Sequence, residues 1–162
     1  MTGDKKPFPL LQSEFLKRQA QISPDERWLA YTSLESGRPE IYVLPFTPAA
    51  KPDAKPGAGK WTVSTAGGTQ PRWSGDGKEL FYVAADGKLM AVEIKATPAA
   101  FDHGAPQALF DLRSEILPSS NFVTGYVPAP DGKRFLVVTT PGTPAESPPL
   151  TVVVNWLRAV KK

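Results

Sequence analysis

The sequence predicts an all-β protein assembled from repeated antiparallel units, and three observations support this. A phrase centred on an aspartate recurs three times, at Asp25, Asp76 and Asp131. A run of β-branched and aromatic residues follows each copy, as is typical of a buried strand. The 18 prolines and 13 glycines fall almost entirely between the strand candidates. Many short strands joined by turns are therefore expected, with very little helix.

The spacing of the repeated phrase selects the architecture. Asp25 and Asp76 are 51 positions apart, and Asp76 and Asp131 are 55 positions apart. A period of this length fits one four-stranded β-propeller blade together with loop insertions. We therefore predict a β-propeller of four-stranded antiparallel blades. The chain of 162 residues has room for about three of them, which is half of a six-bladed ring.

Each copy of the phrase predicts a tight hairpin turn. The aspartate can accept hydrogen bonds from backbone N–H groups two residues further on. Gly77 and Gly132 can supply the positive φ that such turns require. Glu26 stands at the corresponding position of the first copy. That turn must therefore either avoid positive φ at this residue or carry a small strain.

Twelve strands are predicted, in chain order, from alternation and turn residues. An N-terminal candidate and the first unit cover 8–12, 20–23, 28–33, 40–46 and 60–64. The second unit covers 70–74, 79–83, 89–94 and 107–111, and the third covers only 125–128, 134–140 and 150–156. The one helix-compatible stretch, 13–19, is too short and too near Pro24 to form more than a turn or two.

Grouped by the repeat, these strands give a single propeller segment, 1–162. Its blades are expected at about 20–64, 70–111 and 125–156. The strand at 8–12 would complete a blade, either in its own chain or in a second copy. Three blades leave open sheet faces and edges that a soluble monomer would expose. A homodimer that closes a six-bladed ring is therefore expected, with 8–12 of one subunit beside 150–156 of the other.

Composition excludes several kinds of partner. The 19 Lys and Arg residues and 16 Asp and Glu residues give a net charge of +3, and the cations are scattered, so no nucleic-acid partner is expected. The absence of cysteine excludes disulfides, thiolate zinc sites and cysteine nucleophiles. No apolar run reaches the ~18 residues of a membrane span, so this segment is not expected to insert into a membrane, and no signal peptide is visible.

The sequence suggests no catalytic residue, no metal site and no cofactor. His103 is the only histidine, so no second imidazole can complete a zinc site, and no Ser–His pair is obvious. Neither a Gly-x-Ser-x-Gly motif nor a phosphate-binding loop is present. Each repeated aspartate stands nearly alone, whereas a calcium loop needs several oxygen ligands within a dozen residues. We expect these aspartates to stabilise turns.

A candidate ligand site follows from propeller geometry. The innermost strand of each blade lines a central channel, so polar residues on these strands are candidates for ligand contact. The set comprises Gln21, Gln70, Arg72 and Tyr126, with Gln19 and Thr124 on the same strands. Polar side chains around one cation would suit a peptide carboxylate or another anionic group. The alternative is that these residues only solvate the channel.

Two of the repeats resemble the PD40 repeat of TolB-like, or WD40-like, β-propellers. The matching segments are Ile-Ser-Pro-Asp-Glu-Arg-Trp-Leu-Ala-Tyr at 22–31 and Pro-Arg-Trp-Ser-Gly-Asp-Gly-Lys-Glu-Leu-Phe-Tyr at 71–82. Within that superfamily, Gly-Gly-Thr-Gln-Pro-Arg-Trp at 67–73 and Leu-Thr-Val-Val-Val-Asn-Trp at 150–156 resemble the C-terminal sensor propeller of bacterial membrane serine/threonine protein kinases. The resemblance covers nearly the whole chain.

This resemblance implies a non-catalytic propeller that binds a protein or peptide, usually with six blades and exported to the periplasm or beyond. The sequence departs from the family in having about three blades, and it leaves the location of the protein open. The leading hypothesis is a protein- or peptide-binding module, and its finer form is the sensor part of a bacterial kinase. One alternative is a regulatory propeller from an S9-type, prolyl oligopeptidase-like peptidase. Another is a half-propeller that assembles with itself and has no dedicated ligand.

Overall fold

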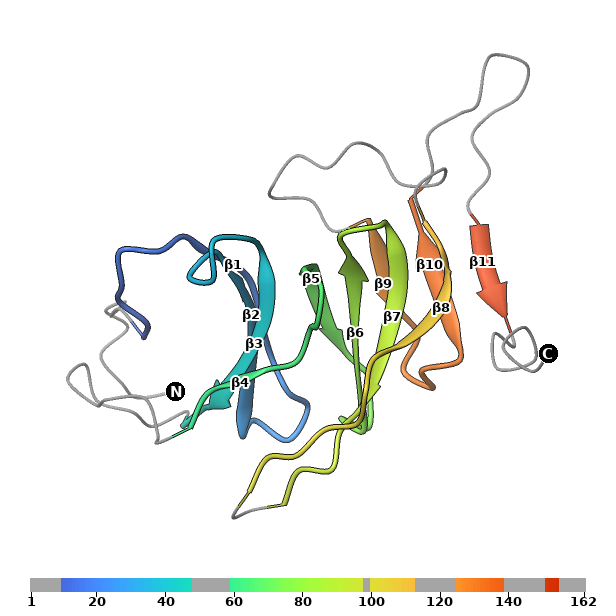
Figure 1. Ribbon diagram of the computed structural model, residues 1–162. Helices are drawn as coiled ribbons and strands as arrows, with labels where there is room; N and C mark the ends of the chain where they lie inside the picture. Colours follow the sequence, from blue (N-terminus) through green and yellow to red (C-terminus); the bar gives the residue numbers. More distant parts are fainter. Residues whose placement is uncertain (1–9, 48–58, 98–99, 113–124, 139–150, 155–162) are drawn as a thin grey trace, which may run out of the picture.

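The computed structural model describes residues 10–47, 59–97, 100–112, 125–138 and 151–154. All regular structure within these ranges is β, with eleven strands in three antiparallel sheets (Figure 1). The described ranges contain no helix with the length and apolar character needed to cross a membrane.

Each sheet is a meander of consecutive strands. Blade 1 contains β1 (Lys17–Ile22), β2 (Trp28–Ser33), β3 (Glu40–Pro45) and β4 (Trp61–Thr62). Blade 2 contains β5 (Gly68–Trp73), β6 (Glu79–Ala84), β7 (Lys88–Glu93) and β8 (Gln107–Asp111). Blade 3 contains β9 (Tyr126–Pro128), β10 (Arg134–Val137) and β11 (Thr151–Val154).

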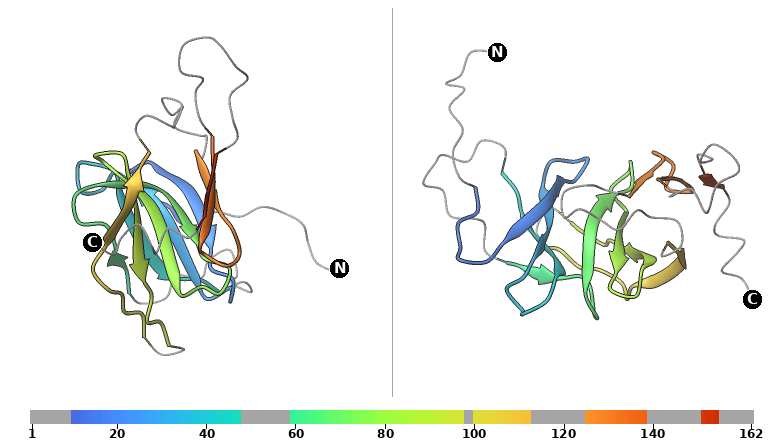
Figure 2. Two further views of the ribbon diagram at one scale, coloured as in Figure 1. Left: turned by 90° about the vertical axis from the view of Figure 1, so that its right-hand side faces the viewer. Right: turned by 90° about the horizontal axis from the view of Figure 1, so that it is seen from above.

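The three sheets follow one another across the molecule, each facing the next (Figure 2). Their first strands are neighbours, since β1 contacts β5 and β5 contacts β9. Successive antiparallel meanders that meet along their first strands have the arrangement of propeller blades. The predicted fold class, a partial β-propeller, is thereby confirmed.

The N-terminal region differs from the prediction. Residues 10–12 of the expected strand 8–12 lie outside any strand, and 8–9 are outside the described residues. The helix-compatible stretch 13–19 forms no helix, and the strand predicted at 20–23 starts earlier: β1 begins at Lys17 and pairs with β2 through Lys17↔Ser33 and Arg18↔Thr32. Backbone hydrogen bonds to a long neighbouring strand outweigh the weak helical preference of a short segment.

The repeated turns form as predicted. In each copy the aspartate Oδ1 accepts a hydrogen bond from the backbone N–H two residues later, at 3.2 Å for Asp25, 3.1 Å for Asp76 and 3.0 Å for Asp131. Glu26 adopts a φ of 58°, close to the 71° of Gly77 and 64° of Gly132. The first turn therefore has the same shape as the others, and Glu26 carries the strain that glycine avoids.

Side-chain alternation along the second strands builds two interblade cores, which we call seam 1 and seam 2. In β6, Leu80 and Tyr82 pack toward blade 1 in seam 1, whereas Phe81 and Val83 pack toward blade 3 in seam 2. The ring of Phe81 meets the ring of Phe135 edge to face, with centroids 4.9 Å apart. Blade 2 is thus covered on both faces, which makes it the centre of the described structure.

Candidate functional site

The inner strands of blades 1 and 2 share an unusual backbone feature. The pairing of β1 with β2 shifts register between Arg18 and Gln21, and that of β5 with β6 shifts between Thr69 and Arg72. Gln19 and Gln70 lie inside these bulges with φ values of 57° and 59°. Positive φ is rare outside glycine, so both positions are held by their surroundings.

The surroundings of these two residues form a relay of hydrogen bonds from blade to blade. The Oε1 atom of Gln19 accepts a hydrogen bond from the backbone N–H of Gln70 at 2.9 Å. The Oε1 atom of Gln70 accepts one from the backbone N–H of Gly125 at 2.7 Å. Gln19, Gln70 and Gly125 each stand six positions before the repeated aspartate. Each glutamine therefore satisfies the same backbone donor of the next inner strand, and a buried donor left unpaired would cost about 1–3 kcal/mol.

Gln70 and Tyr126, two of the predicted channel residues, lie inside this relay. Gln70 is 3% exposed and Tyr126 is fully buried. The Tyr126 hydroxyl donates a hydrogen bond to the backbone carbonyl of Gln70 at 2.8 Å. Burial raises the pKa of the Tyr126 phenol well above its ordinary value, although the nearby charge of Arg72 acts in the opposite direction. Both side chains therefore join the inner strands of blades 2 and 3.

Gln21 and Arg72, the other two predicted residues, are only partly buried. They occupy equivalent positions, four residues before the repeated aspartate, on neighbouring inner strands. Gln21 pairs with Ala30 across blade 1, and Arg72 pairs with Phe81 across blade 2, so each lies at the inner edge of a seam. Gln21 Nε2 donates a hydrogen bond to the backbone carbonyl of Ala20 at 3.0 Å, and Arg72 Nη1 donates one to the backbone carbonyl of Pro71 at 3.2 Å.

The structure therefore brings all four predicted residues to the inner strands, in two layers. Gln70 and Tyr126 are buried between the blades, and Gln21 and Arg72 are partly buried at the inner edges of the seams. Thr124 lies outside the described residues. Sequence reasoning placed Gln19 on an inner strand but missed its relay with Gln70. Gln19 and Gln70 each stand six positions before a repeated aspartate, and this shared spacing could have indicated that they have equivalent roles.

Glu40 and His103 are two other polar groups within the described ranges. The buried carboxylate of Glu40 accepts hydrogen bonds from Ser64, from the backbone N–H of Gly67 and from Arg38, so its oxygens are used within the fold. His103 is partly buried, and its Nδ1 lies 2.9 Å from the carbonyl oxygen of Gly104. No group of three or more His, Cys, Asp or Glu side chains in these ranges is arranged to hold a metal ion.

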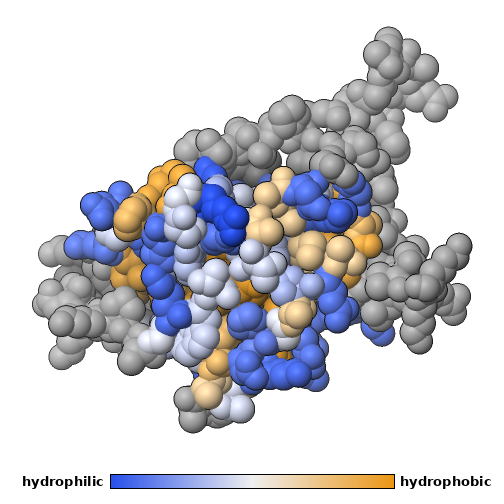
Figure 3. All heavy atoms as spheres, in the orientation of Figure 1, coloured by the Kyte–Doolittle hydropathy of each residue, from blue (hydrophilic) through white to orange (hydrophobic). Residues whose placement is uncertain are grey.

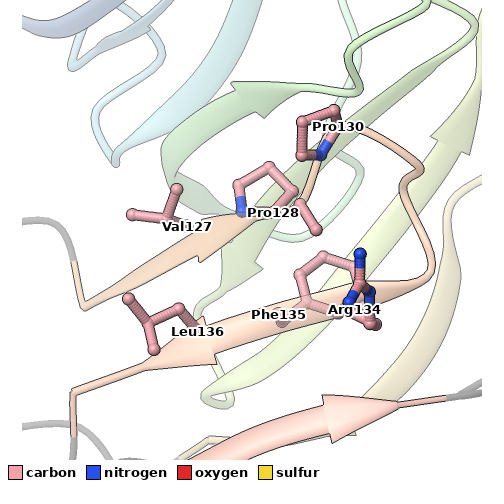
Figure 4. A pocket seen from close by; sticks show the side chains of 7 residues that line it. Val127, Pro128, Pro130, Arg134, Phe135 and Leu136 are labelled. Carbon is pink, nitrogen blue, oxygen red and sulfur yellow. The ribbon is translucent and has the colours of Figure 1, made fainter.

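A surface that the sequence analysis did not single out lies on blade 3. A shallow apolar groove of about 340 Å³ is lined by residues of β9, β10 and the turn between them (Figure 4). Val127 and Leu136 are a cross-strand pair and stand beside each other at one end of the groove. Arg134 lies at the opposite end and forms an ion pair with Asp131 at 3.1 Å.

Comparisons with known proteins give one kind of match. No protein-family model matches the chain, and no curated protein matches it. Among solved structures, TolB from Acinetobacter baumannii is similar, with 19% sequence identity and a TM-score of 0.44. The match covers 93% of this chain and 46% of the TolB chain, so this chain spans about half the length of that protein.

Proposed function

We propose that this chain is a non-catalytic propeller module that binds a protein or peptide partner. The observation that carries the proposal is the two-layer arrangement at the inner strands. Buried hydrogen bonds hold Gln70 and Tyr126 between the blades, and the partly buried Gln21 and Arg72 stand beside them. Binding groups mounted on fixed strands lose little conformational entropy when a ligand arrives.

The proposed ligand feature is a carboxylate or another anionic group on a peptide. Arg72 supplies a guanidinium, which recognises a carboxylate through paired hydrogen bonds. Gln21, at the equivalent position of the neighbouring strand, can donate from its amide to the same group. Gln70 and Tyr126 belong to the site as its support, because their polar atoms fix the strand that carries Arg72.

The wider context of the module is a finer proposal. The motifs at 67–73 and 150–156 favour the sensor part of a bacterial membrane kinase, which would lie in the periplasm. The alternative is a regulatory propeller of an S9-type peptidase. The full reading frame separates them, since a preceding kinase domain with a membrane helix supports the first and a following α/β-hydrolase supports the second.

Ring closure also belongs to this proposal. We propose the boundaries 20–64, 70–111 and 125–156 as three blades of one segment, and a homodimer as the complete six-bladed ring. A self-assembling half-propeller with no dedicated ligand is the competing proposal. It shares the ring but has no binding role for Arg72.

The binding proposal is tested with a library of peptides that carry either a free C-terminal carboxylate or an amidated end. We expect carboxylate peptides to bind, and Arg72→Ala to weaken them by about 10-fold or more, the scale of a charge-assisted hydrogen bond. Gln21→Ala should weaken them less. Lys133→Ala, which removes an exposed cation from a turn of blade 3, is the control and should change nothing. Equal binding by the Arg72→Ala variant would contradict the proposal.

A further inference from the structure

The exposed apolar side chains are confined to the two ends of the blade series. Six large apolar residues among those described are more than a third exposed. Phe15 (42%), Leu16 (58%) and Ile22 (48%) belong to the N-terminal end, while Val127 (52%), Leu136 (38%) and Val138 (42%) belong to blade 3. None comes from blade 2. In Figure 3 apolar side chains gather at the upper left, over the N-terminal segment, and at the right, over blade 3.

The repeat explains the exposed face of blade 3. We call the side of a blade that packs on the next blade its trailing face, and the opposite side its leading face. Phe81 and Val83 lie on the trailing face of blade 2 and are buried in seam 2. Leu136 and Val138 occupy the same positions relative to the repeated aspartate, and they are exposed. Blade 3 therefore carries the docking face of a blade with no further blade seated on it in the described structure.

A matching leading face is present on blade 1. Leu80 and Tyr82 form the leading face of blade 2 and pack in seam 1. Leu29 and Tyr31 occupy the equivalent positions of blade 1 and are the same two residue types. They cluster with Tyr42 and Leu44, and this cluster is covered by three apolar side chains that are themselves only partly buried: Leu10, Leu11 and Phe46.

We propose that the trailing face of blade 3 docks on the N-terminal end of blade 1 of a second copy of this chain. The contact continues an interface that the chain already makes twice, in seams 1 and 2. Because the two faces differ, the contact is head to tail, and two copies of three blades form two identical junctions and close the ring. The inference rests on the proposed ring and specifies which surfaces meet.

The hydrogen-bond relay indicates how this junction differs from the internal seams. Gln19 and Gln70 each reach the next inner strand, whereas Gly125 has no side chain at that position. The junction between copies therefore depends on apolar contact through Val127, Leu136 and Val138, without a glutamine bond from blade 3. A docking face held by apolar packing alone is expected to dissociate on dilution before the chain unfolds.

The proposed contact between the two copies is tested by cross-linking through introduced cysteines. The chain has no cysteine of its own, so only the introduced residues can react. Phe46 lies beside the leading face of blade 1, at the position that Ile94 occupies in blade 2. In the proposed ring, Leu136 of one copy faces this region of the other. The double variant Leu136→Cys/Phe46→Cys, treated with a short bismaleimide, should give a covalent dimer, whereas each single variant should stay monomeric on a denaturing gel. No dimer from the double variant, or equal dimer from Leu136→Cys alone, would overturn the proposal.

A charge substitution tests the energetics. Leu136→Asp places a carboxylate in the apolar junction and should raise the dimer dissociation constant by at least about 10-fold. At concentrations where the chain is monomeric, its unfolding transition should be unchanged. Gln107→Asp adds the same charge at an exposed position of blade 2 and should leave association unchanged. Association of the Leu136→Asp variant equal to that of the Gln107→Asp variant would contradict the docking face.

These experiments separate the docking surface from the binding proposal. Arg72→Ala should weaken peptide binding and preserve the dimer, while Leu136→Asp should weaken the dimer. Loss of the peptide result alone would remove the ligand proposal, and loss of the cross-link alone would remove the second copy as the occupant of blade 3.

Discussion

Blade 2 and blade 3 show the same strand pattern in two different settings. In β6 of blade 2, alternate side chains face blades 1 and 3, and all four central residues are buried. In β10 of blade 3, Phe135 and Val137 are buried against blade 2, whereas Leu136 between them is 38% exposed. The same alternation of residues therefore gives a two-sided core only where something covers both faces of the strand. In blade 2 the cover is a blade on each side, and in blade 1 the outer face is covered by Leu10, Leu11 and Phe46.

The largest test of this comparison uses two adjacent residues. Phe135→Ala removes a fully buried ring from seam 2 and should destabilise the chain by about 3–5 kcal/mol. Leu136→Ala acts on the exposed face of the same strand and should change the stability of the monomer by less than about 1 kcal/mol. Urea unfolding followed by circular dichroism, at a concentration where the chain is monomeric, checks both values. Similar losses for the two variants would show that both faces of blade 3 are covered.

The second test concerns the glutamine relay. Gln70→Ala leaves the buried N–H of Gly125 without its acceptor and should cost about 1–3 kcal/mol. Gln70→Gly removes the same acceptor but relieves the positive φ, so it should be less harmful than alanine by about 1 kcal/mol. The two variants are compared by the urea midpoint at equal m-value. A glycine variant less stable than the alanine variant would argue against strain at Gln70.

The third test uses the first turn as a strained copy of the other two. Glu26→Gly gives this turn the residue that the equivalent turns have at the same backbone angle, and it should stabilise the chain by about 1 kcal/mol. Glu26→Ala keeps the strain and serves as the control. In thermal unfolding, the glycine variant should have a higher melting temperature than the wild type. The melting temperature of the alanine variant should be close to that of the wild type. A glycine variant that melts below the wild type would show that the glutamate side chain is needed.

The smallest expected effect is a pH dependence within blade 2. Burial raises the pKa of the Glu79 carboxyl, and the charges of Asp76 and Glu93 add to this. A raised folded-state pKa means that the ionised form opposes folding above that pKa, and that this penalty fades as pH falls through it. Glu79→Gln should therefore stabilise the chain near neutral pH and lose its advantage in acid. The measurement is the difference in urea midpoint between variant and wild type across pH.

Asp76 provides the opposite sign as a control. A hydrogen bond from the backbone N–H of Lys78, and one from Ser74, hold the pKa of its carboxyl below the ordinary value. Its contribution to stability is present at neutral pH and is lost as pH falls through the folded-state pKa. Asp76→Asn should lower the stability of the chain at neutral pH. The variant should then lose less stability than the wild type as pH falls into the acid range. Parallel curves for Asp76→Asn and Glu79→Gln would contradict these assignments.

Much of the fold follows from local chemistry in the sequence. The three turns are encoded by Asp25, Asp76 and Asp131 and by the residues that follow them, so the strands on either side fall close to their predicted places. The strand over Trp28–Ser33 matches its prediction at both ends. Local hydrogen bonds and alternation determine these features, and both are visible without a structure.

The parts that the sequence did not predict depend on partners distant in the chain. The strand that begins at Lys17 forms because its backbone pairs with β2, and no residue near Lys17 predicts that pairing. The positive φ values of Gln19 and Gln70 arise in bulges, which residue type does not reveal. The predicted channel residues include both buried residues that join the blades and partly buried ones. Gln70 and Gln21 are the same residue type and differ only in their surroundings, so the sequence could not separate them.

We propose that the exposed face of blade 3 forms one more interblade seam with a second copy of the chain. Sedimentation equilibrium of the unmodified chain over micromolar concentrations tests it most directly. We expect a reversible, discrete species of twice the 17.5 kDa chain mass, and no larger assembly. A folded species of 17.5 kDa that persists across the whole range would contradict it.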